Sequence, residues 1–386
     1  MSVWKNLLQR WNQSWQPIKR EADLLKQRMF RQQIPLFLVG IGLTAAIAAC
    51  SGGTTNHSVG TSPAGQTVAQ NNPDLQLTLV SFAVTKAAHD AIIPKFVEQW
   101  KKEHNQTISF SQASYGGSGS QAQKVIEGGL EGDIVHLALG LDINKIVSAG
   151  LIAPGWEKRT PNQGVASKSV VALAVRPGNP KGIKNFADLA RNGVSIVTAN
   201  PTTSGVARWN FLALWNSVIK TSGDETKALD FVTQVYRNVP ELPEDARLAR
   251  EVFYKRGVGD ALLNYENEII LAQQQGEKVE YVVPDVNISI ENPVAIVDRN
   301  VDKHGTRKVA EAFVKFLFTP EAQEEFAKVG FRPIDEAIAK EKEFVEKYPK
   351  IHKLSTVQDF GGWDQVQQKF FADGGVFDQI QTRIKK

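Results

Sequence analysis

Apolar residues along the chain alternate between the spacing of strands and the spacing of helices. Residues 75–82 (LQLTLVSF) alternate as in a half-buried strand, and residues 86–105 place apolar side chains on one helical stripe. Further strands are predicted at 107–113 and 133–139, and further helices at 118–131 and 141–150. This βαβαβα order is typical of a mostly parallel sheet covered by helices.

The same alternation starts again after residue 168. The expected strands are 169–177, 194–199, 279–284 and 293–298, and the expected helices are 205–221, 224–236, 245–256, 260–274, 305–318 and 320–328. Thr319-Pro320 is a strong start signal for the last of these helices. We expect an α/β protein with two lobes, residues 75–168 plus 294–386 and residues 169–293, with the chain crossing near 165–175 and 288–296.

The N-terminal segment has the pattern of a secretory signal. Residues 1–33 hold seven basic and two acidic residues, and an apolar run of 16 residues follows, from Ile34 to Ala49. A bilayer span needs about 20 residues, whereas a basic region, a short apolar region and small residues describe a cleaved signal. Ile47-Ala48-Ala49-Cys50 resembles a bacterial lipobox, which implies a lipoprotein signal peptide over 1–49 and lipidation of Cys50. The alternative is an uncleaved single-pass anchor.

The rest of the chain is nearly neutral. Residues 50–74 are small and polar and predict a flexible tether. Beyond residue 33 the chain has 38 basic and 39 acidic residues, which argues against nucleic-acid binding because that function needs a basic face. With a single cysteine, an intrachain disulfide is impossible.

Two glycine-rich turns are candidate anion sites. Tyr115–Ser120 (YGGSGS) and Asn200–Asn210 (NPTTSGVARWN) each follow a predicted strand and open a predicted helix. Free N–H groups and the positive end of the helix dipole meet at such a turn. The alternatives are that the glycines only serve the turn and that Ser204 only caps its helix.

Catalytic and metal-binding patterns are missing from the sequence. There is no Walker-type phosphate loop, and the six histidines form no HxxxH or HExxH pair. No acid, base and nucleophile can be assembled. We expect no enzyme activity, no catalytic residue, no cofactor and no metal site.

Several segments together resemble the sulfate- and thiosulfate-binding proteins of bacterial ABC importers. NPTTSGVARWN (200–210) is similar to a family signature, although Thr202 stands where lysine is usual. The other matching segments are YGGSGSQ (115–121), LALGLDIN (137–144), VRPGNPKGI (175–183), YENE (265–268), FRP (331–333), FGGW (360–363) and FADGGVFDQI (371–380).

This resemblance implies a type II periplasmic-binding-protein fold, whose two lobes are joined by a two-strand hinge, with an oxyanion in the cleft. The ligand positions that carry over are the N–H groups of Ala83 and Ser118, the Ser204 hydroxyl, the N–H groups of Gly205, Val206 and Ala246, and a side-chain donor at Tyr265. Tyr265 stands where the family has tryptophan. Glu244-Asp245-Ala246 replaces a Ser-Gly-Ala-like turn, and a carboxylate pointing inward there would argue against a bound dianion.

The resemblance also implies a place and partners for the protein. We expect a monomer in the periplasm, held by its lipid on the outer face of the cytoplasmic membrane, that delivers sulfate or thiosulfate to permease and ATPase subunits. The alternatives are another oxyanion, such as molybdate or tungstate, and more distantly an enzyme acting on sulfate or phosphate esters.

Overall fold

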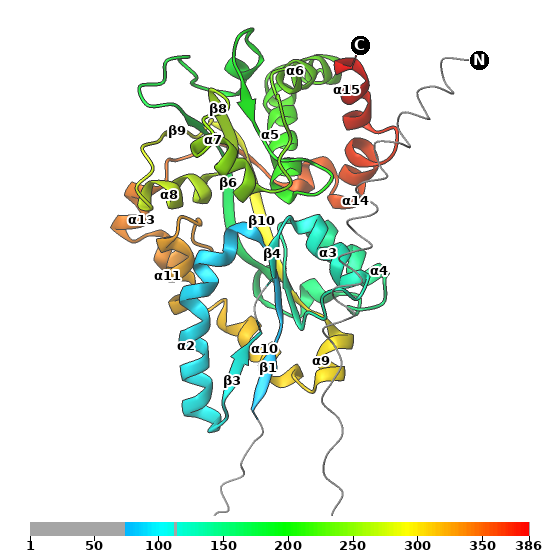
Figure 1. The fold of residues 1–386 in the computed structure, drawn as a ribbon, viewed down its shortest axis with the longest axis vertical. Helices are drawn as coiled ribbons and strands as arrows, with labels where there is room; N and C mark the ends of the chain where they lie inside the picture. The colour runs from blue at the N-terminus through cyan, green and yellow to red at the C-terminus, as the bar shows by residue number, and fades with distance from the viewer. Residues whose placement is uncertain (1–73, 112–113, 386) are drawn as a thin grey trace, which may run out of the picture. The chain divides into compact units, whose positions relative to one another are not determined.

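The computed structural model describes residues 74–111 and 114–385 (Figure 1). The predicted signal peptide, Cys50 and residues 50–73 of the predicted tether lie outside these ranges. Within the described ranges, no helix combines the length and the apolar character that a membrane span requires.

The strands form one large mixed sheet and one small sheet. The small sheet pairs β1 with β3 in parallel, and the large sheet has the order β4-β2-β5-β10-β6-β8-β7, with β11 added to β10 and β9 added to β6. Their bounds are β1 Leu75–Leu77, β2 Leu79–Phe82, β3 Ile108–Phe110, β4 Ser114–Gly116, β5 Ile134–His136, β6 Val165–Val175, β7 Ile196–Val197, β8 Ala261–Tyr265, β9 Glu280–Val282, β10 Val286–Ile296 and β11 Lys353–Ser355.

The helices pack on both ends of this large sheet. Their bounds are α2 Lys86–His104, α3 Ser118–Ile126, α4 Gly140–Ser148, α5 Gly205–Ser222, α6 Glu225–Arg237, α7 Ala246–Tyr254, α8 Glu266–Gln274, α9 Asp298–His304, α10 Arg307–Phe316, α11 Pro320–Lys328, α12 Glu336–Ala339, α13 Lys342–Lys347, α14 Trp363–Val366 and α15 Val376–Ile384. In Figure 1, α5 to α8 lie toward one end of β6 and β10, and α2, α3, α4, α9 and α10 lie toward the other.

Two long antiparallel strands, β6 and β10, connect the two ends. The first half of β6 pairs with β10, and its second half, Val171–Val175, pairs with β8. The last residues of β10, Val294–Ile296, pair instead with β5. Within each end the sheet has parallel pairs, β2 with β4 and β5, and β7 with β8. The prediction of an α/β fold with two lobes is therefore confirmed.

Several predicted elements have other bounds in the structure, and two differ in type or continuity. Residues 260–274 were expected to form one helix, but Ala261–Tyr265 is the strand β8 and only Glu266–Gln274 is helical. Every side chain of β8 is buried, and a fully buried apolar run does not reveal its period. The strand expected at 75–82 is divided at Thr78, whose N–H donates to Asp133 Oδ2 at 2.7 Å, and its two parts join different sheets.

The C-terminal segment, residues 357–384, packs against α5 and α6 of lobe 2. The rings of Phe370 and Phe371 lie 5.6 and 5.2 Å from that of Phe211 in α5, and Phe377 lies 5.6 Å from Tyr236 in α6. From the sequence we expected all of residues 294–386 to belong to lobe 1. We instead propose that residues 357–384 belong with lobe 2, since α5 and α6 supply their aromatic contacts.

Candidate functional site

A small pocket lies where the starts of several helices meet. It is lined by all seven predicted ligand residues, Ala83, Ser118, Ser204, Gly205, Val206, Ala246 and Tyr265, together with Phe82, Val84, Gly116, Gly117, Ala138 and Asp245. The fold thus brings together, in one place, residues that span more than 180 positions of the sequence.

Four helical segments begin at this pocket. Ala83 opens η1 (Ala83–Thr85), which runs into α2, and Ser118, Gly205 and Ala246 are the first residues of α3, α5 and α7. The first N–H groups of a helix have no intrahelical partner, and each helix start carries about half a positive charge. No lysine, arginine or histidine is among the described lining residues. The positive potential at this pocket therefore comes from main-chain groups and not from a cationic side chain.

The side chain of Ser118 is held away from the pocket. Its hydroxyl donates to Asp142 Oδ2 at 2.7 Å and accepts from the Ala138 N–H at 3.0 Å. Asp142 is fully buried and also binds the ammonium of Lys145 at 2.9 Å. These bonds fix the first turn of α3, so its main-chain N–H is the group that Ser118 can present.

Ser204 and Gly205 form the opposite wall. Ser204 is the N-cap residue of α5, but its hydroxyl makes no capping hydrogen bond and stays available for a ligand. A Cβ at Gly205 would lie 2.4 Å from Ala138 Cβ, in the other lobe. Only glycine therefore allows this close approach of α5 to the end of β5.

The two carboxylates at the start of α7 point in different directions. Glu244 is exposed, and its Oε1 accepts a hydrogen bond from the Ser120 hydroxyl at 3.3 Å. Asp245 lines the pocket, but its Oδ1 accepts from the Leu248 N–H at 2.8 Å and so caps its own helix. The main-chain N–H of Ala246, the first residue after this cap, has no intrahelical partner.

Tyr265 supplies a buried hydroxyl without a partner. Its side chain is 1% exposed, and its Oη finds no hydrogen-bond partner among the described residues. Burial raises the pKa of Tyr265 well above its ordinary value, so the phenol keeps its proton. The side chain therefore brings a donor into the pocket, and a buried polar group without a partner is costly unless something binds it.

The rest of the 200–210 motif is structural. The guanidinium of Arg208 donates to Pro201 O and Gln367 Oε1, at 2.9 and 2.8 Å. The indole of Trp209 donates to Ala138 O at 3.0 Å, and the Asn210 amide donates to Leu263 O at 3.1 Å. These side chains tie α5 to the sheet and to the C-terminal segment.

The structure also pairs two histidines that the sequence left scattered. His89 Nε2 and His136 Nδ1 lie 3.1 Å apart, and His89 Nδ1 lies 3.2 Å from the Tyr115 hydroxyl. Burial lowers the pKa of His89 far below its ordinary value and that of His136 to about 3. No spacing rule could reveal this pair, because 47 positions separate its members. Within the described ranges, no group of three or more His, Cys, Asp or Glu could hold a metal ion.

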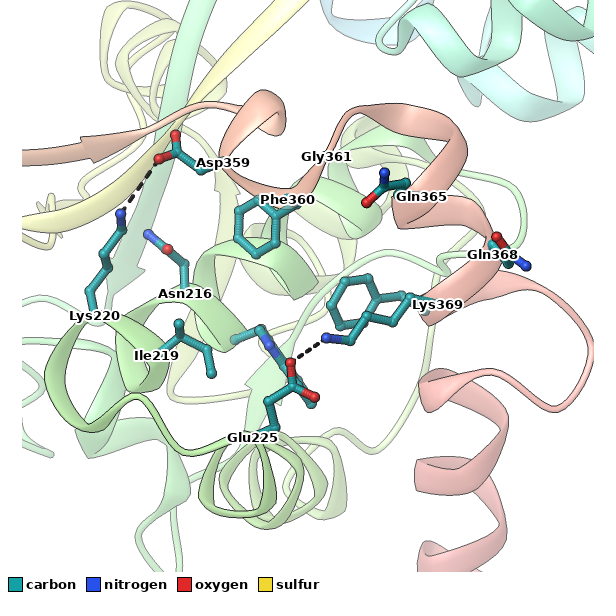
Figure 2. Close-up of a pocket in the computed structure, with 12 residues that line it drawn as sticks. Asn216, Ile219, Lys220, Glu225, Asp359, Phe360, Gly361, Gln365, Gln368 and Lys369 are labelled. Atoms are coloured by element: carbon teal, nitrogen blue, oxygen red, sulfur yellow. Dashed lines mark hydrogen bonds and ion pairs between the residues drawn. The ribbon is translucent and has the colours of Figure 1, made fainter.

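A larger cavity of about 750 Å³ lies between α5, α6 and the C-terminal segment (Figure 2). Its charged groups are already paired, Lys220 with Asp359 at 3.5 Å and Lys369 with Glu225. Since its cations are matched by carboxylates, this cavity offers an anion no unpaired cation. The small pocket is therefore the better anion site.

The chain is similar to known proteins over most of its length. Residues 77–332 match the family described as bacterial extracellular solute-binding protein. A sulfate-binding protein of Synechococcus elongatus is 57% identical over 88% of this chain and 93% of its own length. A thiosulfate-binding protein of Pseudomonas aeruginosa is 39% identical over 78% of this chain and 91% of its own. The solved structure of the sulfate-binding protein SubI from Mycobacterium tuberculosis, 34% identical, aligns with a TM-score of 0.70 over 77% of this chain and 99% of its own.

Proposed function

Since this chain belongs to the bacterial extracellular solute-binding proteins, we propose that it captures sulfate or thiosulfate in the small pocket and delivers the ion to an ABC importer. The relatives above are named as binding proteins for these two ions. Because the family is described as extracellular, we expect this protein to act outside the cytoplasm.

The observation that carries the proposal is the set of donors around one point. Helix starts at Ala83, Ser118, Gly205 and Ala246 meet at the pocket, and Tyr265 adds a buried hydroxyl that lacks a partner. Hydrogen bonds to a charged group are roughly twice as strong as neutral ones. Several such bonds would offset the cost of removing a dianion from water, without a salt bridge.

The same donors favour an ion without a proton. Sulfate and thiosulfate carry no proton at neutral pH, so each of their oxygens can accept. Hydrogen phosphate would bring an O–H toward donors, and a buried polar group left unpaired costs about 1–3 kcal/mol. Among the described lining residues only Asp245 has a carboxylate, and its Oδ1 accepts the Leu248 N–H and caps α7.

Contacts across the pocket belong to a closed arrangement of the lobes. The Gly119 N–H in α3 donates to Thr203 O at 3.2 Å and so joins the start of α3 in one lobe to the loop before α5 in the other. Within that second lobe, the Thr203 hydroxyl donates to Glu244 O at 2.6 Å and ties the loop before α5 to the loop before α7. We propose that the lobes move about β6 and β10 to admit the ion, and that the closed form is the one that docks on the importer.

Competing ligands are separated by titration. Isothermal calorimetry of the ligand-free protein with sulfate, thiosulfate, molybdate and phosphate measures each affinity directly. Tight binding of sulfate or thiosulfate with weak binding of phosphate supports the proposal. Binding of molybdate alone would assign the protein to another oxyanion, and release of a phenol from an aryl sulfate ester would indicate an enzyme.

We also propose that Cys50 carries a lipid that anchors a monomer to the outer face of the cytoplasmic membrane. The support is the Ile47–Cys50 lipobox-like sequence in front of a polar stretch. Mass spectrometry of the membrane-extracted protein is expected to find a chain that begins at Cys50 and carries acyl groups on that residue, and Cys50→Ser should abolish the acyl mass. An unmodified chain that retains residues 1–49 would argue for the uncleaved anchor instead.

A further inference from the structure

Asp245 is an unusual component for a pocket that attracts anions. Among the thirteen described residues that line the pocket, it is the single one with an acidic side chain. It is 9% exposed, so water screens its charge poorly. Asp245 is the N-cap residue of α7 and directly precedes Ala246, which also lines the pocket.

Several nearby groups act on the charge of this carboxylate, and their net effect raises its pKa above the ordinary value. Burial raises the pKa of Asp245, while the hydrogen bond from the Leu248 N–H and the charge of Arg247 act in the opposite direction. The guanidinium of Arg247 is engaged elsewhere, since it donates to both oxygens of the buried Glu268 at 3.0 and 2.8 Å. Within the described ranges no cation forms an ion pair with Asp245.

We propose that Asp245 sets the charge selectivity of the site, by opposing divalent oxyanions and so limiting the affinity for sulfate. The inference rests on the proposed function. The repulsion is proportional to the charge of the ligand, so it penalises a dianion about twice as strongly, in free energy, as a monoanion of similar size. Asp245 thus acts as a repulsive element that lowers the affinity and hastens the release of a bound dianion.

The test compares two substitutions that keep the helix cap. Asparagine and serine are as good N-cap residues as aspartate, so Asp245→Asn and Asp245→Ser remove the charge while they preserve the start of α7. Glu244→Gln is the matched control, because it removes a neighbouring carboxylate that does not line the pocket. Calorimetric titrations with sulfate, selenate and perchlorate at low ionic strength measure the effect on two dianions and one tetrahedral monoanion.

Both Asp245 variants are expected to bind sulfate and selenate about tenfold more tightly and perchlorate about threefold more tightly. Glu244→Gln is expected to change each affinity less than twofold. Unchanged or weaker sulfate binding by the Asp245 variants, or an equal gain in Glu244→Gln, would overturn the inference. Absence of sulfate binding by the unsubstituted protein would instead refute the proposed function, so the two failures are distinguishable.

Discussion

The Tyr265→Phe substitution should have two opposite effects: it should weaken the binding of sulfate and stabilise the ligand-free protein. The Tyr265 hydroxyl is buried and lacks a partner among the described residues. Its removal takes away one hydrogen bond to a charged ligand, worth about 1.5–3 kcal/mol. Since 1.4 kcal/mol corresponds to a factor of ten, we expect sulfate affinity to fall about 10- to 150-fold.

The same substitution should stabilise the ligand-free protein. An unsatisfied buried polar group costs about 1–3 kcal/mol, so its loss should raise the melting temperature of the ligand-free protein by about 2–4 °C for each kcal/mol gained. Tyr236→Phe is the matched control, because the buried Tyr236 hydroxyl also finds no partner in the described part of the chain but lies in α6, outside the pocket. Calorimetry gives the affinities and differential scanning fluorimetry the melting temperatures.

The comparison of the two phenylalanine variants has a clear negative outcome. Both should gain stability without ligand, and only Tyr265→Phe should lose affinity. If Tyr265→Phe binds sulfate as tightly as the unsubstituted protein, Tyr265 does not donate to the ligand. If both variants lose affinity equally, the effect is not local to the pocket.

Three further predictions concern other parts of the molecule. Ser204→Ala should weaken sulfate binding about tenfold with an unchanged melting temperature, because the hydroxyl makes no capping bond; equal affinity by calorimetry would remove Ser204 from the ligand set. Gly117 has an ordinary φ of −61°, yet a Cβ there would lie 2.6 Å from Thr203 O. Gly117→Ala should therefore hinder closure of the lobes and weaken sulfate binding, while the ligand-free protein stays equally stable. An unchanged affinity for sulfate would contradict this prediction. His89 and His136 are neutral when folded because burial lowers the pKa of both, and the unfolded chain takes up protons below about pH 6.5. Stability should therefore fall as the pH drops below 6.5, by at most about 1.4 kcal/mol per pH unit for each histidine, and denaturant titrations that show equal stability at pH 7 and pH 5 would contradict it.

The elements that sequence predicted well are those with local signals. The helix expected at 320–328 is α11 with the same bounds, because Thr319 caps it and Pro320 opens it. The helix expected at 205–221 extends over Gly205–Ser222 and ends at a left-handed glycine. The prediction of a helix was wrong at residues 261–265, because this strand is buried on all sides and has too few polar positions to reveal its period.

The sequence predicted which residues form the candidate site, and the structure adds their contacts and the directions of their hydrogen bonds. Resemblance selected seven residues, and all seven line one pocket. The sequence did not reveal that Asp245 caps its own helix while lining the pocket, or that Glu244 faces Ser120. Nor did it reveal the approach of Gly205 to Ala138, which depends on how two distant loops meet.

The central claim is that donors from several helix starts hold an oxyanion that carries no proton. Competition between sulfate and phosphate in mildly alkaline buffer tests it most directly, because both ions are then divalent and differ by one proton. The account predicts that sulfate binds at least about tenfold more tightly, given the cost of an unpaired O–H. Equal affinities, or tighter binding of phosphate, would contradict it.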